Sequence, residues 1–140
     1  MKPKISPEDY REILSSLELK TLFLKEINSE FKEELLSQAL ILDLKEKSSF
    51  TQIGRNVNII FKYQLKAKDA DKEAAAITVN ATYIVQYGQD KDIQITNEFM
   101  KVFEEMTLGN LLWPYFRELT SNMIYRMNLP PLVLPLRKRL

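Results

Sequence analysis

The chain has 140 residues, 45% of them hydrophobic and 28% charged, with a net charge of +1, which are ordinary values for one soluble domain. It contains no Cys and no His, which excludes disulfides, thiolate nucleophiles, zinc ribbons, imidazole metal sites and the Ser-His-Asp triad. Its three glycines, Gly54, Gly88 and Gly109, are too far apart for a phosphate-binding loop. We therefore expect neither an enzyme nor a bound cofactor or metal.

Location and partner class follow from the same composition. The first ten residues lack the apolar stretch of a secretory signal. The longest uncharged stretch, residues 74–89, has 16 residues and is shorter than the roughly 20 that a spanning helix needs. The near-neutral net charge argues against a nucleic-acid binder, which would usually show a basic stripe. We expect a cytoplasmic protein with no membrane insertion and no nucleic-acid partner.

The first expected element is a short amphipathic helix over residues 6–15, within an N-terminal segment of residues 1–16. Ser6 can cap it, Pro7 suits its first position, and acidic residues follow near the positive end of the dipole. Tyr10, Ile13 and Leu14 place apolar groups on one face.

The clearest pattern is an alternation of apolar residues with mostly polar ones over 57–68 and again over 75–87, broken only where an apolar residue such as Ile60 takes an alternate position. This period predicts two long antiparallel strands with one buried face. Residues 17–27 and 39–49 also read as strands, but Leu22, Phe23 and Leu24 lie on both faces, as do Leu40 and Ile41. Such strands must be covered twice, by the fold or by a partner. Residues 28–38 form the expected crossover between them, within a sheet region spanning 17–89.

Residues 96–127 are expected to be helical. Thr96 or Asn97 can cap the segment, Gly109 is expected to interrupt it, and Pro114 is tolerable in a first turn or as a kink. The apolar set from Leu111 to Met127 is wider than the roughly 100° stripe of a helix packed on one side. The simplest second neighbour is another copy of the protein. Residues 128–140 form a Pro-rich tail with a basic end.

A sequence signature lies at the start of this long helix. Leu112, Trp113, Pro114, Tyr115 and Phe116, followed by Arg-Glu, resemble the signature of the SecB family of export chaperones. A short Pro-containing segment with alternating apolar residues follows the family's helix, as residues 129–134 do here. The motif covers about 25 residues, and the compatible strand order extends the resemblance over most of the single domain, residues 1–140.

The resemblance implies an α+β fold: a four-stranded antiparallel Greek-key sheet packed by the long C-terminal helix, assembled as a dimer of dimers. It also implies an ATP-independent holdase that binds unfolded or nascent polypeptides along an exposed apolar groove, flanked by the crossover. We expect the client surface to include Leu22, Leu24, Phe31, Leu35, Leu40, Leu42 and Leu44, although each could instead fill the core. The oligomer interface is expected to include Leu112, Trp113, Tyr115, Phe116, Leu119 and Met123.

Departures from the family bear on which client is served. SecB chains of the export pathway carry acidic groups that help them dock onto the SecA motor. Here the expected outer sheet face offers Lys62, Lys66 and Lys68, and the family's last helix is replaced by the basic tail. Docking to SecA is therefore in doubt, and a dedicated client, such as the antitoxin of a toxin–antitoxin system, is slightly favoured over general export.

Two other interpretations stay open. The first is an adaptor or structural protein with the same fold that binds a folded partner. The second is a cation site at Asp69, Asp71 and Glu73. The Gly and bidentate Glu of an EF-hand loop are missing there, which favours a solvated turn.

Overall fold

The computed structural model describes residues 5–130, so most of the tail expected over residues 128–140 lies outside the described residues. Its helices are α1 (Pro7–Ser16), α2 (Asn97–Phe103) and α3 (Gly109–Arg126). Its strands are β1 (Leu17–Phe31), β2 (Leu40–Ile53), β3 (Asn56–Asp69) and β4 (Ile77–Gln89). A short 3-10 turn, η1 (Glu33–Leu35), lies in the crossover, and a π-helical segment, η2 (Glu104–Leu108), joins α2 to α3.

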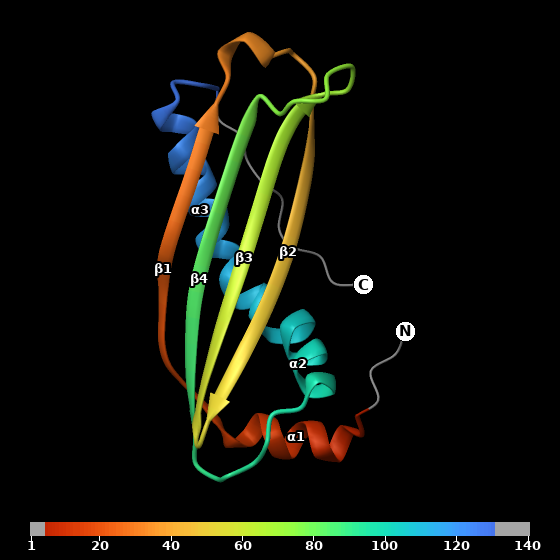
Figure 1. The fold of residues 1–140 in the computed structure, drawn as a ribbon, viewed down its shortest axis with the longest axis vertical. Coiled ribbons are helices and arrows are strands. Elements are labelled where there is room, and N and C mark those ends of the chain that lie inside the picture. The colour runs from red at the N-terminus through yellow and green to blue at the C-terminus, as the bar shows by residue number, and fades with distance from the viewer. Residues whose placement is uncertain (1–4, 131–140) are drawn as a thin grey trace.

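The four strands form one antiparallel sheet in the order β1-β4-β3-β2. The meander β2-β3-β4 is followed by β1 at the far edge, which is the Greek-key arrangement. The helices α2 and α3 lie on one side of the sheet, and α1 lies at one end (Figure 1). The expected α+β class, with a four-stranded sheet and a long C-terminal helix, is confirmed.

The N-terminal helix begins where its sequence predicts. The Ser6 side chain accepts a hydrogen bond from the backbone N–H of Asp9 at 3.1 Å, and Pro7 is the first helical residue. Ile13 is buried, and Tyr10 packs on Phe99 of α2 with ring centroids 4.9 Å apart. The helix therefore closes one end of the core.

The two edge strands are longer than their sequence pattern indicates. β1 continues through Asn28 to Phe31, which pair with β4 from Asn80 to Ile77, and β2 continues through Phe50 to Ile53. Backbone pairing with a long neighbour needs no apolar alternation, so these residues extend the ladder although their side chains are mixed. The crossover consequently starts at Lys32, four residues later than expected.

The helical region has one irregularity, and it is not at Gly109. Gly109 is buried and helical, with φ −59°, whereas the π-helical turn occupies the five residues before it. Pro114 lies inside α3 on an exposed side, where water can satisfy the carbonyl that its missing N–H leaves unpaired. The helix ends with Asn128 at φ 58° and the Leu129 N–H bonded to the Ile124 carbonyl at 3.3 Å, which is a Schellman motif.

The core lies between the sheet and the C-terminal helices. The residues of β3 and β4 that alternate along each strand, from Val57 to Ala67 and from Ile77 to Tyr87, are buried. Tyr63 of β3 stacks on Phe116 of α3 with ring centroids 4.4 Å apart and an interplanar angle of 12°. We call this covered side of the sheet the helix face and the opposite side the open face.

Candidate functional site

The helix face is covered only along its middle. α3 packs over β3 and β4, where Tyr63 contacts Trp113 and Phe116. The edge strands β1 and β2 extend beyond this cover, so their residues on the helix face stay partly open. They form two apolar margins, one on each side of the helix.

The β2 margin consists of Leu40, Leu42 and Leu44. Leu42 and Leu44 pair with the buried Ala67 and Leu65, which places their side chains on the helix face. Leu42 is 40% exposed and Leu44 is 37% exposed, whereas Leu40 is half-buried. Leucines with this much open surface on a face that is otherwise core mark a place where a further apolar group can bind.

The β1 margin contains the predicted Leu22 and Leu24 and two residues that the sequence pattern missed, Leu19 and Ile27. The register pairs all four with helix-face residues of β4, and Leu19, Leu24 and Ile27 are exposed. Register shifts at Lys20 and Lys25 separate the four by steps of three, two and three residues. A β-bulge inserts one extra residue, so strict alternation cannot reveal this margin.

One end of the helix face is closed by Phe31, the last residue of β1, and by Leu35 of the crossover, both half-buried. Beside it lies a hollow of about 530 Å³ between the crossover, the β2 margin and the end of α3, with mostly apolar walls. Its lining includes Leu36, Leu40, Leu42, Ile77, Ile124 and Leu129. The structure thus brings Leu40 and Leu42 together in one hollow, but places Leu22 and Leu24 at the opposite edge of the sheet.

The residues expected at an oligomer interface divide into two sets. Leu112, Trp113 and Phe116 are buried against the chain's own sheet. Leu119 and Met123 are only half-buried and Tyr115 is 51% exposed. With Leu111, these three recur every four residues and form a second apolar stripe along α3. The helix therefore has two apolar sides, as its sequence indicates.

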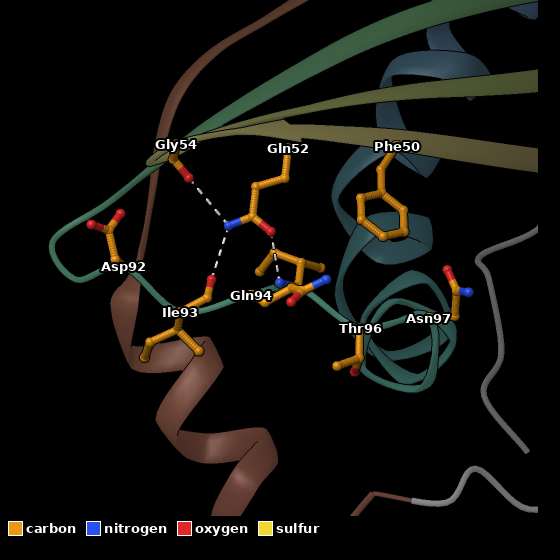
Figure 2. Close-up of a pocket in the computed structure, with 9 residues that line it drawn as sticks. Phe50, Gln52, Gly54, Asp92, Ile93, Gln94, Thr96 and Asn97 are labelled. Carbon is orange, nitrogen blue, oxygen red and sulfur yellow. Dashed lines mark hydrogen bonds between the residues drawn. The ribbon is translucent and has the colours of Figure 1, made fainter.

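A second hollow, of about 710 Å³, lies where β2 meets the connection between β4 and α2. Gln52 occupies its centre (Figure 2). The Gln52 amide donates to the Ile93 carbonyl at 2.9 Å and to the Gln89 side chain at 2.8 Å, and accepts from the Ile95 N–H at 2.8 Å. Gln89 in turn donates to the Ser16 hydroxyl at 3.2 Å. These hydrogen bonds tie α1, β2 and β4 together at this end of the sheet.

Three ionisable groups among the described residues have a shifted pKa: Asp69, Tyr83 and Tyr87. Interactions with the Ser37 side chain and with the Asp71 N–H, which donates to the carboxylate at 2.8 Å, lower the pKa of Asp69. Burial raises the pKa of Tyr83 to about 12 and also raises the pKa of Tyr87. Within residues 5–130 no three Asp or Glu side chains converge as metal ligands, and no helix is both long and apolar enough to cross a bilayer.

Comparison with known proteins yields a match of fold. No family model matches the sequence, and no curated protein matches it. Among solved structures, the chain is similar to the SecB-like chaperone Rv1957 of Mycobacterium tuberculosis, solved in complex with a ChAD peptide from the Rv1956 HigA1 antitoxin. The TM-score is 0.76 at 16% sequence identity, covering 92% of this chain and 96% of that one. A protein of unknown function from Streptococcus agalactiae matches at a TM-score of 0.43 and 10% identity, covering 85% and 96% of the two chains. The chain has the fold of a SecB-like chaperone, so the expected resemblance is confirmed at the level of the fold.

Proposed function

We propose that the chain is a cytoplasmic SecB-like chaperone that holds unfolded polypeptides without ATP. The observation that carries this proposal is the bare apolar surface of the two margins, where Leu24, Leu42 and Leu44 are 37–40% exposed on the face that elsewhere forms the core. Apolar segments of an unfolded client can cover the two margins, because burial of apolar area is favourable and non-directional. Such binding requires no catalytic group.

The two margins and the hollow beside the crossover suit an extended client. A chain in the β conformation presents side chains alternately, about 7 Å apart on one side, which is also the spacing of Leu40, Leu42 and Leu44 along β2. The hollow beside Leu40 and Leu42 can accept one larger side chain, while the strand edge offers backbone hydrogen bonds. The partly open leucines favour a holdase. In an adaptor that binds one folded partner, we would expect the chain itself to cover these leucines fully.

We favour a dedicated client, such as an antitoxin, over general export. The solved structure of similar fold holds an antitoxin peptide, and the open face carries lysines where an acidic surface would help docking to SecA. A toxin–antitoxin pair encoded beside this chain would support the dedicated role, and binding to SecA would support export.

We further propose that the protein assembles as a homotetramer, a dimer of dimers. The second apolar stripe of α3, with Tyr115, Leu119 and Met123, is the surface that a second copy would cover. Exposed apolar area of this extent is a hazard on a monomer, and assembly would hide part of it while the margins remain open to clients.

The decisive experiment replaces Leu42 and Leu44 together with Gln and measures capture of a slowly folding client by suppression of its light scattering. Complete burial of one leucine is worth about 1.5–3 kcal/mol, and less than half of each side chain is still open. We therefore expect the double variant to lose about 2 kcal/mol of client binding, roughly thirtyfold in affinity. Its melting temperature should fall by several degrees, because more than half of each side chain is buried in the free protein, but the variant should stay folded at the temperature of the assay.

Ile41→Gln is the matched control, because Ile41 lies between Leu40 and Leu42, is 53% exposed and faces the open side of the sheet. Client capture should survive this change. If the control loses capture as much as the double variant does, or if the double variant captures client normally, the margins are not the client surface. If the double variant is unfolded at the temperature of the assay, the two leucines are core residues and the proposed client surface is wrong.

A further inference from the structure

The open face of the sheet has an uneven distribution of charge. No described helix covers it (Figure 1). Its residues alternate along each strand with the buried ones, and four exposed lysines gather on the two strands β2 and β3: Lys45, Lys47, Lys62 and Lys66. The neighbouring strand β4 contributes Asn80 and Thr82 to the same rows, and acidic side chains appear only beyond it, on β1, and at Asp43.

Two of these lysines are placed where they repel each other. Lys47 lies directly across from Lys62 in the register of β2 and β3. Residues in this relation have Cβ atoms about 4.5–5.5 Å apart, and like charges there destabilise the sheet. Within residues 5–130, none of the four lysines forms an ion pair with a carboxylate within 4.0 Å. Asp43 lies directly across from Lys66 and offsets part of its charge, so the positive charge that no acidic residue faces across β2 and β3 is concentrated at Lys45, Lys47 and Lys62.

The lysines surround a hollow rather than a flat surface. A depression of about 610 Å³ is lined by Lys45, Lys47 and Lys62 together with Gln64, Asn80 and Thr82, and its lining also includes two acidic residues, Glu26 on β1 and Glu46 on β2. The Asn80 side-chain oxygen is buried here and has no hydrogen-bond partner among the described residues. A buried acceptor without a partner is unfavourable, so a ligand N–H that pairs with the Asn80 oxygen after rotation of this side chain towards the hollow would be favoured.

These groups distinguish between kinds of anion. A phosphate dianion can pair with one or two of the lysines, but it is too small to span Lys62 and Lys66, which lie four residues apart along β3. A long nucleic acid would also meet Glu26 and Glu30 on β1. A polypeptide with acidic side chains supplies carboxylates for the lysines and backbone N–H groups for the amide oxygen. Its alternate side chains repeat about every 7 Å, as do Lys45 and Lys47 along β2.

We propose that the open face over β2 and β3 binds an acidic polypeptide segment in an extended conformation, with its carboxylates between Lys45, Lys47, Lys62 and Lys66. The segment lies on the side of the sheet opposite the leucine margins, so both surfaces can be occupied at once. The proposal does not depend on client binding, because it uses no residue of either margin.

The test measures fluorescence anisotropy of a labelled eight-residue peptide of alternating Glu and Thr, with peptides of alternating Gln and Thr and of alternating Lys and Thr as comparisons. We expect only the Glu peptide to bind, and its affinity to fall as salt is added. The double variant Lys47→Glu with Lys62→Glu should weaken binding about tenfold or more, because like charges across an interface are strongly unfavourable.

The matched control is the double variant Lys91→Glu with Lys101→Glu, which makes the same change in net charge at exposed residues away from the open face. It should bind the Glu peptide as the wild type does. Equal weakening by both double variants would reduce the effect to net charge and overturn the proposal. Binding of inorganic phosphate or of a thymidine oligonucleotide in place of the peptide would overturn the choice of a polypeptide.

A single variant separates a binding role from a packing role. Lys47→Glu converts the repelling pair into an opposite-charge pair with Lys62, so the melting temperature should rise while peptide affinity falls. A fall in melting temperature would show that Lys47 is kept for packing, and this outcome would also contradict the proposal.

Discussion

Tyr83 shows how burial of one polar residue couples the stability of this protein to pH. It lies on β4 facing the helices and is 3% exposed. Burial raises the pKa of its phenol to about 12, with a smaller contribution from the charge of Glu118. Tyr83 therefore loses its proton at a lower pH in the unfolded chain than in the folded one.

We expect the free energy of unfolding to fall between pH 10 and about 12. Over this window the unfolded tyrosine releases its proton while the folded one keeps it, so the unfolded state binds fewer protons and stability decreases as pH rises. Urea denaturation at several pH values measures the slope. Tyr83→Phe should make the slope shallower without abolishing it, because the pKa of Tyr87 is also raised. An unchanged slope in the variant would contradict the assignment.

At the scale of elements, α3 acts as a two-sided helix whose sides have different tasks. Its buried side holds Leu112, Phe116 and Ile124 against the sheet, and Phe116 stacks on Tyr63. Its other stripe stays partly open. The apolar surface of this helix is wider than one packed side needs. The structure divides it into one side that packs in the chain's own core and one side that the described residues leave partly open.

Truncation of the buried side should be costly. We expect Phe116→Ala to lower the free energy of unfolding by about 3–5 kcal/mol, because it removes a completely buried ring and leaves a cavity. Chemical denaturation measures the loss. The control Tyr125→Ala, at a residue of the same helix that is 81% exposed, should stay within about 0.5 kcal/mol of the wild type. Similar losses in the two variants would mean that α3 does not pack as described.

At the scale of the whole molecule, the open stripe of α3 makes assembly a measurable consequence. Light scattering of the pure protein should report a mass close to four chains, each of 16.4 kDa. Met123→Glu places a charge in the half-buried stripe and should shift the mass towards smaller species. Ser121→Glu, at an exposed position of the same helix, should leave it unchanged. A monomeric wild type would refute the proposed tetramer.

Much of the sheet could be predicted because β3 and β4 are buried on one face only. Apolar residues recur at every second position from Val57 to Ala67 and from Ile77 to Tyr87, because successive side chains of a strand point to opposite faces. The edge strands could not be bounded in the same way. Asn28 to Phe31 and Phe50 to Ile53 join the ladder through backbone pairing with long neighbours, for which side-chain pattern is a poor guide.

The amino-acid sequence by itself determined the α+β architecture, the capped first helix and the two apolar sides of α3, because these depend on periodicity and on local capping chemistry. Only the tertiary structure decided which leucines stay open. Two bulges in β1 place Leu19 and Ile27 beside Leu22 and Leu24, and the strand order sends Leu42 to the opposite edge. The repelling pair of Lys47 and Lys62 also depends on register, since alignment between strands is set by long-range pairing and not by either strand alone.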